Sequence, residues 1–173
     1  MRLETDLARI EELAKQKDDE NWRFRSFLKV YDGPDGRIDS IVHDLYQRVS
    51  SAIDCRQCAN CCKRIRPALS QKDIRAFAAG LRMPVDEFRA RHLVPGETWG
   101  EWRFSKLPCP FLAENLCTNY EHRPRDCRSF PHLHKMDFTA RLWNVVENYS
   151  ICPIVFNVYE HLKEALWHGN HLS

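Results

Sequence analysis

The feature that most constrains this chain is a run of cysteines denser than any ordinary helix or strand requires. Residues 54–64 read DCRQCANCCKR and contain Cys55, Cys58, Cys61 and Cys62. Two residues between cysteines let both sulfurs turn toward one metal ion about 2.3 Å away. The other four cysteines complete a set that suffices for two four-thiolate sites: Cys109, Cys117, Cys127 and Cys152. The pattern predicts all eight as metal ligands or near-ligands, with the loops of the fold gathered where the cysteines are.

Disulfides are the first alternative use of the cysteines. The sequence begins MRLETDLARIEELAKQKDDE, which has no apolar signal-peptide core, so we expect a cytoplasmic protein. Cytosolic cysteines are normally kept reduced. A bridge between the adjacent Cys61 and Cys62 would also be strained. Disulfides are therefore disfavoured, although the even number of cysteines would permit them.

Two further alternatives leave the cysteines without metal. Free cysteine behaves as a small buried hydrophobe, a role that suits Cys117 or Cys152 taken singly. Burial as a hydrophobe does not explain four cysteines clustered in one run. A thioredoxin-type C-x-x-C pair is expected between a strand and a helix, whereas this run follows a predicted helix and has extra cysteines.

The spacing leaves the identity of the metal open between zinc and iron. A C-x2-C-x2-C run with a remote Cys-Pro resembles the ligand set of a 4Fe–4S cluster, and Pro110 and Pro153 each follow a cysteine. The doublet Cys61–Cys62 favours paired sites or two bridged ions, since neighbouring side chains diverge. His132 and His134 lie close in sequence to Cys127 and are candidate ligands or supporting contacts. The C-terminal HGNH sequence is a weaker candidate.

Cationic residues flank the cysteines, and they suit either of two roles: an ordinary solvated basic face, or charges that offset the two net negative charges of a divalent ion held by four thiolates. They are Arg56, Lys63, Arg64, Arg66, Arg123, Arg125 and Arg128. The net charge of the chain is only +2, and no nucleic-acid motif accompanies these residues or Trp99 and Trp102. No apolar run reaches the length of a membrane span. The expected partner is a metal ion, without membrane or nucleic acid; a protein partner is not identified, and no catalytic arrangement stands out, so enzymatic activity is left open.

Apolar periodicity predicts a mainly α fold. Residues 3–17, 38–53 and the segment after Cys152 carry apolar side chains at three- and four-residue steps. Ser70 and Asp73 predict the start of another helix, with Gly80 at its end. The fold class is a small helical domain with long loops organised around a cysteine-ligated metal cluster. The expected division is a helical extension over 1–36, packed on the core, and a cysteine-cluster metal-binding domain over 37–173.

Other segments have weaker signals. The segment PVDEFRARHLV predicts a short helix beginning near its proline. Residues 96–108 alternate aromatic and polar side chains, as a strand or hairpin arm does. The segment from Pro108 to Leu133 is rich in proline and turn formers and predicts loop with short helical turns. A polar break, QKDDEN, precedes a short docked helix or irregular segment that ends in the turn DGPDG.

Several pieces of the sequence together resemble one known family. CRQCANCC, followed by CPFLAENLCTNYEHRPRDCRSFP, is similar to the CxxCxxCC family of zinc- or iron-chelating proteins, the YkgJ-like cysteine-cluster proteins. The shared elements fall on Cys109–Leu112, Cys117–Tyr120 and Arg123–Pro131. The spacer LSQKDIRAFAAGLRMPVDEFRARHL is also similar, and the resemblance covers about residues 53–155.

The resemblance implies metal chelation by a bacterial protein, an activity inferred in that family from its cysteines. Flagellin lysine methylases carry a similar cluster in larger proteins. Two classes of function follow: a metal-binding protein with one or two thiolate-held centres, or an iron–sulfur redox or protein-modifying enzyme component related to those methylases. This chain shows no Gly-rich methyl-donor site, which disfavours methyl transfer.

Overall fold

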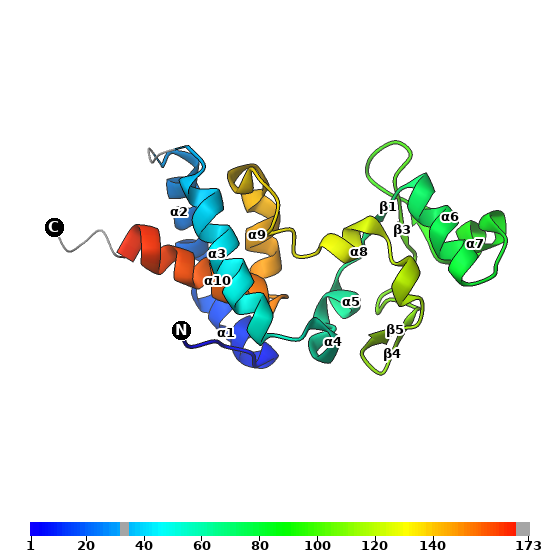
Figure 1. Cartoon of the computed structure of the whole chain (residues 1–173), viewed down its shortest axis with the longest axis horizontal. Helices are drawn as coiled ribbons and strands as arrows, with labels where there is room; N and C mark the ends of the chain where they lie inside the picture. Colours follow the sequence, from blue (N-terminus) through cyan, green and yellow to red (C-terminus); the bar gives the residue numbers. More distant parts are fainter. Residues whose placement is uncertain (32–34, 169–173) are drawn as a thin grey trace. The chain divides into compact units, whose positions relative to one another are not determined.

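The computed structural model describes residues 1–31 and 35–168 of the chain, and these are mainly α-helical, as predicted (Figure 1). The chain forms two compact units. We call Met1–Asp54 with Pro131–Ser173 the helical unit, and Cys55–Phe130 the cysteine unit. These boundaries are not those of the expected division at residue 36, which stays a prediction. Positions 32–34 of the predicted DGPDG turn, and His171 of the HGNH sequence, lie outside the described residues.

The helical unit is built from both ends of the chain. Its helices are α1 (Leu7–Gln16), α2 (Asp18–Lys29), α3 (Arg37–Ala52), α9 (Leu142–Tyr149) and α10 (Pro153–Lys163). A 3-10 turn, η2 (Phe138–Arg141), precedes α9, and a π-helical turn, η3 (Glu164–His168), follows α10. No helix in residues 1–31 or 35–168 is long and apolar enough to cross a membrane.

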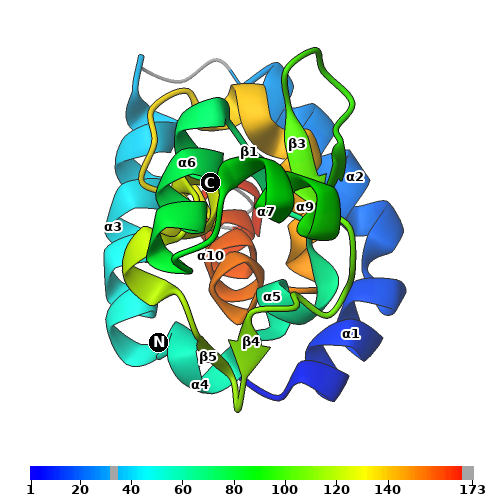
Figure 2. The same cartoon turned by 90° about the vertical axis from the view of Figure 1, so that its right-hand side faces the viewer.

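Helix α10 is the centre of the helical unit. It packs against α3 on one side and against α9 and α1 elsewhere, as Figures 1 and 2 show. Its residues from Pro153 to Tyr159 are all buried. A helix that is apolar on every side is stable only inside a core, which explains this central position. Helix α3 shows the complementary pattern, because it buries Val42 and Val49 on one face.

The break predicted by QKDDEN is shorter than expected. Only Lys17 separates α1 from α2, and α2 begins at Asp18. Its first turn contains Asp18, Asp19 and Glu20. Acidic side chains there stabilise a helix N-terminus through the helix dipole, so this polar segment starts a helix.

The cysteine unit combines short helices with short strands. Its helices are α4 (Cys55–Cys58), α5 (Asn60–Arg64), α6 (Gln71–Gly80), α7 (Val85–His92), the 3-10 turn η1 (Tyr120–His122) and α8 (Arg125–Ser129). Its strands are β1 (Ala68–Leu69), β2 (Leu93–Pro95), β3 (Trp102–Phe104), β4 (Leu112–Ala113) and β5 (Leu116–Cys117). The first three form an antiparallel sheet in the order β1-β3-β2, and β4 pairs with β5.

Aromatic side chains form the core of this unit. Phe77 of α6 contacts Phe88, Phe104 and Phe111, with ring centroids 5.4, 5.5 and 4.8 Å away. Helices α6 and α7 pack against each other and lie side by side in Figures 1 and 2. Aromatic pairs at these separations add to the free energy gained by burial. The cysteine unit therefore has a hydrophobic core of its own.

The start of α6 agrees with the sequence. Ser70 is the N-cap and forms a capping box with Asp73, and the helix ends at Gly80. The predicted strand near residues 96–108 is β3. Helix α7 begins one residue later than its proline suggests, because Pro84 is the N-cap.

Candidate metal centre

The cysteine run folds into two short helices joined at a left-handed residue. Cys55 and Cys58 lie on α4, and Cys61 and Cys62 lie on α5. Ala59, between them, has φ 49° and is buried. Left-handed backbone costs an alanine about 1 kcal/mol, so the turn is stabilised by its surroundings. The amide of Ala59 donates to the Cys55 carbonyl (2.9 Å), and that of Ile65 to the Cys61 carbonyl (2.8 Å).

A backbone hydrogen bond joins the run to the second cysteine region. The amide of Cys109 donates to the carbonyl oxygen of Cys62 at 2.8 Å, and the Cys109 carbonyl accepts from Leu112 at 3.0 Å. Cys109 is half-buried and packs against the aromatic core. The chain thus enters the hairpin β4–β5 next to the end of the run.

The hairpin positions Cys117. Leu112 pairs with Cys117 and Ala113 with Leu116, which leaves Glu114 and Asn115 as a two-residue turn. Both turn residues have positive φ, 49° and 63°. That conformation is the type I′ turn, whose twist matches antiparallel strands. This hairpin is absent from the sequence-based expectation, which placed loop here.

Helix α8 carries Cys127 and is held by two carboxylates. Asp73 of the α6 capping box accepts a hydrogen bond from the Arg125 amide (2.9 Å), at the start of α8. Asp126 accepts one from the Ala68 amide of β1 (3.0 Å). Burial raises the pKa of Asp73, but the bonds from Ser70 and Arg125 outweigh burial and leave it below its ordinary value. Neither aspartate was singled out as a supporting residue from the sequence.

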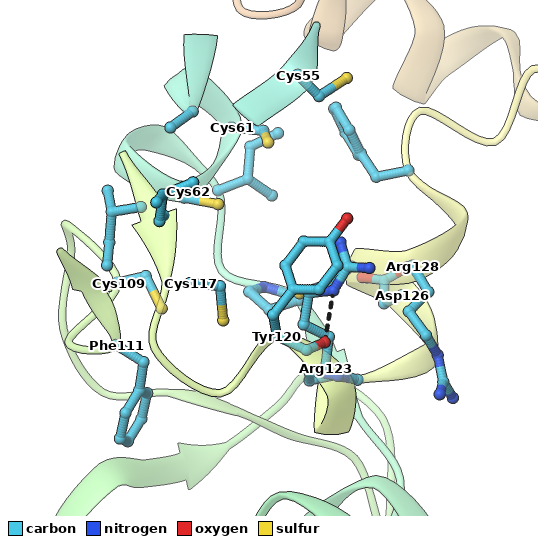
Figure 3. A pocket seen from close by; sticks show the side chains of 18 of the residues that line it. Cys55, Cys61, Cys62, Cys109, Phe111, Cys117, Tyr120, Arg123, Asp126 and Arg128 are labelled. Carbon is cyan, nitrogen blue, oxygen red and sulfur yellow. Dashed lines mark hydrogen bonds between the residues drawn. The ribbon is translucent and has the colours of Figure 1, made fainter. Parts of the chain in front are cut away.

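Six of the eight predicted ligands line one cavity of about 310 Å³ within the cysteine unit: Cys55, Cys61, Cys62, Cys109, Cys117 and Cys127. Figure 3 shows Cys62, Cys109 and Cys117 on neighbouring segments of its wall. Phe77, Phe104 and Phe111 supply an apolar wall. Cys58 is not among the lining residues. All eight cysteines are thiols, and none is in a disulfide.

The thiols influence one another electrostatically. The Cys61 hydrogen bond lowers the pKa of Cys62 to about 7, with help from Arg123 and against the effect of burial. Burial raises the pKa of Cys109 to about 11, and a charged Cys62 adds to this rise. Burial and the Cys62 charge also raise the pKa values of Cys117 and Cys127. These four cysteines therefore form an interacting set in which Cys62 ionises first.

The donor set fits a thiolate-held metal centre in its chemistry. Soft thiolates are the preferred ligands of zinc and of iron–sulfur clusters. In the described residues, however, no three Cys, His, Asp or Glu side chains are grouped as a single metal ion would require. The cysteines that line the cavity therefore surround a common space and do not form a closed single-ion site among the described residues.

The eighth cysteine, Cys152, lies in the helical unit. It is buried and is the N-cap residue of α10, as the sequence indicated, with Pro153 in the first turn. Its amide donates to the Asn148 carbonyl at 2.9 Å. His132 and His134 also belong to the helical unit. Their assignment, and that of Cys152, as ligands stays a prediction.

Arg123 and Tyr120 are further lining residues. The Arg123 guanidinium carbon lies 3.4 Å from the centroid of the Tyr120 ring, and its Nε donates to the Tyr120 carbonyl at 2.8 Å (Figure 3). The sequence marks Arg123 only as one cation among several. Tyr120 carries no signal of its own beyond the family-like Cys-x-x-Tyr spacing.

One of three comparisons with known proteins gives a match. Neither a search of curated proteins nor one of solved structures gives a match. A family model does match, and it covers all eight cysteines. Because the model described as "CxxCxxCC: Putative zinc- or iron-chelating domain" matches residues 54–153, more than half of the chain, the protein belongs to that family.

Proposed function

We propose that the cysteine unit chelates a metal centre with Cys62, Cys109, Cys117 and Cys127 as its principal ligands. The observation that carries this proposal is their position on one cavity wall. They come from four separate pieces of chain: α5, the segment before β4, the end of β5, and α8. The Cys62 charge also acts on each of the other three. Because these distant pieces come together only when the unit folds, metal binding and folding of the unit are coupled.

The remaining thiols are candidates for a second set of contacts. Cys55 and Cys61 line the same cavity, and Cys58 lies between them in the run. They suit a second centre, or further ligands to the first. Cys152 would join only if the helical unit contributes to the site.

The geometry favours a polynuclear iron–sulfur centre over a single zinc ion. Four sulfurs around zinc, each about 2.3 Å from it, lie roughly 3.8 Å apart in a tetrahedron. Six cysteines line a cavity of about 310 Å³, which is larger than one ion needs. In a 4Fe–4S cluster each thiolate binds a different iron, so the sulfurs are further apart. Such a centre supports electron transfer or redox sensing, and reduced ligands fit the expected cytoplasmic location.

Metal analysis tests this proposal. Protein purified without oxygen is expected to be brown and to contain iron and acid-labile sulfide in equal amounts. Stoichiometric zinc in colourless protein would overturn the iron–sulfur assignment and leave chelation standing. Substoichiometric metal of every kind, even after reconstitution, would overturn chelation itself.

Serine variants then assign the ligands. Cys109→Ser and Cys127→Ser are expected to lose most of the metal, since each removes a principal ligand. Unchanged metal content in both would contradict the four-cysteine set. Cys152→Ser decides whether the helical unit supplies a further ligand, because retained metal confines the site to the cysteine unit.

A further inference from the structure

We propose that Arg123 is the fixed counter-charge of the metal centre, a positioning residue that sets its affinity and reduction potential. This inference rests on the proposed function, because it assigns a role to Arg123 only when thiolates and metal are present in the cavity. None of the hydrogen bonds described above joins the Arg123 side chain to a sulfur atom.

Arg123 is held in place by its own segment of chain. Its guanidinium lies on the face of Tyr120, 3.4 Å from the ring centroid, and its Nε bonds the Tyr120 carbonyl at 2.8 Å. The segment is anchored in turn by Asn119, a buried residue whose side-chain amide donates to the Phe77 carbonyl at 2.9 Å. Arginine stacks on aromatic rings with little loss of freedom per contact. Arg123 is thus a preorganised cation.

The charges on the cavity wall match those of a loaded centre. Among the described side chains that line the cavity, the cations are Arg56, Arg123 and Arg128, and the carboxylate is Asp126. Three guanidinium groups against one carboxylate leave a surplus of two positive charges. Four thiolates on a divalent ion carry two negative charges, and so do four thiolates on a cluster core of charge +2. The wall and the centre therefore balance, which leaves little surplus charge to attract an anionic substrate.

Arg123 is the most effective of the three cations by position. Arg56 and Arg128 are exposed, whereas Arg123 is partly buried. Charges in water are screened far more strongly than charges withdrawn from it. Arg123 also lines the same cavity as Cys62 and Cys117, which belong to different segments of the proposed site. Removing it should weaken the centre without removing any ligand.

The test compares Arg123→Gln with the unaltered full chain. Both are reconstituted without oxygen from ferrous iron and sulfide, and the potential is measured by redox titration of the visible absorption. We expect Arg123→Gln to keep its cluster but to have a reduction potential lower by about 59 mV. For a one-electron couple this is a tenfold change in the equilibrium constant for reduction. The loss of a nearby positive charge disfavours the added electron.

Two comparisons separate this role from a structural one. Arg123→Lys keeps the charge without the planar stack, and is expected to restore most of the potential. Arg125→Gln removes an exposed arginine that does not line the cavity, and is expected to change nothing.

The outcomes distinguish the two proposals. A loaded Arg123→Gln protein with an unaltered potential, or an Arg123→Lys protein as altered as Arg123→Gln, overturns the role of Arg123 and leaves chelation intact. If the centre holds zinc, the readout is competition for Zn²⁺ with a chromophoric chelator, and about tenfold weaker binding is expected for Arg123→Gln alone. An unaltered protein that binds neither metal overturns both proposals.

Discussion

The backbone of Cys109 is bonded directly to that of Cys62, with the Cys109 amide donating to the Cys62 carbonyl at 2.8 Å. This bond joins two cysteine regions that are far apart in the sequence, and it uses peptide groups instead of sulfur. Both side chains remain available to a metal. The register between the regions is thus set by the fold, which reduces the ordering that metal binding must bring about.

The first prediction concerns Asp73, which connects α6 to α8. Its carboxylate accepts from the Ser70 amide (2.9 Å), the Ser70 hydroxyl (2.6 Å) and the Arg125 amide (2.9 Å). Asp73→Asn keeps the shape but loses the charge and one acceptor. We expect the free energy of unfolding of the cysteine unit to fall by about 2 kcal/mol, because the variant weakens the hydrogen bonds made by a charged group and the capping of a helix. Denaturant unfolding followed by circular dichroism measures this.

The control for Asp73 is Asp86→Asn on α7, where the carboxylate side chain is 96% exposed. It is expected to change the free energy of unfolding by less than about 0.5 kcal/mol. Hydrogen exchange adds a local readout, since the amides of α8 should exchange faster in Asp73→Asn. Equal protection of α8 in both variants would contradict the connection.

The second prediction concerns the turn that positions Cys117. Asn115 has φ 63°, a conformation that asparagine and glycine tolerate and β-branched residues do not. Asn115→Val is expected to destabilise the hairpin by about 1–2 kcal/mol and to weaken metal binding, because Cys117 pairs with Leu112 across it. Asn115→Gly keeps the turn and should retain both properties. Weakened metal binding in Asn115→Gly, or unchanged metal binding in Asn115→Val, would rule out this positioning role.

Local features of the fold could be predicted from the sequence. Ser70 and Asp73 are three residues apart and gave the start of α6, and the apolar periodicity of residues 38–53 placed the end of α3 just before Cys55. Both depend on residues close in the chain. The hairpin β4–β5 was missed because its turn, Glu114-Asn115, lacks the glycine that normally marks a type I′ turn.

Long-range relationships could not be predicted in this way. The eight cysteines were recognised by spacing, but spacing does not show that Cys152 belongs to a different compact unit from the other seven. That separation arises because the two ends of the chain form one bundle around α10. The bond from Arg125 to Asp73 likewise depends on tertiary packing, to which no local sequence pattern refers.

The third prediction concerns removal of the metal. Removing the metal with a chelator under reducing conditions is expected to speed hydrogen exchange in residues 54–64 and 108–130, because these segments carry the proposed ligands. The helical unit is the internal control, since its core around α10 includes no proposed principal ligand. Peptides from α10 should keep their protection. Unchanged exchange in the cysteine regions would show that metal binding and folding are independent.

The fourth prediction concerns Glu160 in the helical unit and the effect of pH. Its Oε1 accepts from Lys163 Nζ (2.7 Å) and Tyr149 Oη (2.8 Å), and Lys17 binds the other oxygen. Burial raises the pKa of Glu160, but the bonds from Lys163 and Lys17 outweigh burial and leave it below its ordinary value. A depressed carboxyl pKa stabilises the fold above the unfolded pKa of about 4.3, and this stabilisation is lost as pH falls through the folded value.

Glu160→Gln therefore has two expected effects on the helical unit. At pH 7 the variant is less stable than the unaltered protein, because Lys163, which is only 1% exposed, loses the Glu160 carboxylate and is left with that of Glu20. Between pH 5 and 3 the variant should lose less stability, since it lacks the group that takes up a proton. Glu12→Gln, an exposed carboxylate paired with Arg9, is the control and should follow the unaltered protein. Parallel acid-unfolding curves for Glu160→Gln and the unaltered chain would exclude Glu160 as the source of this pH dependence.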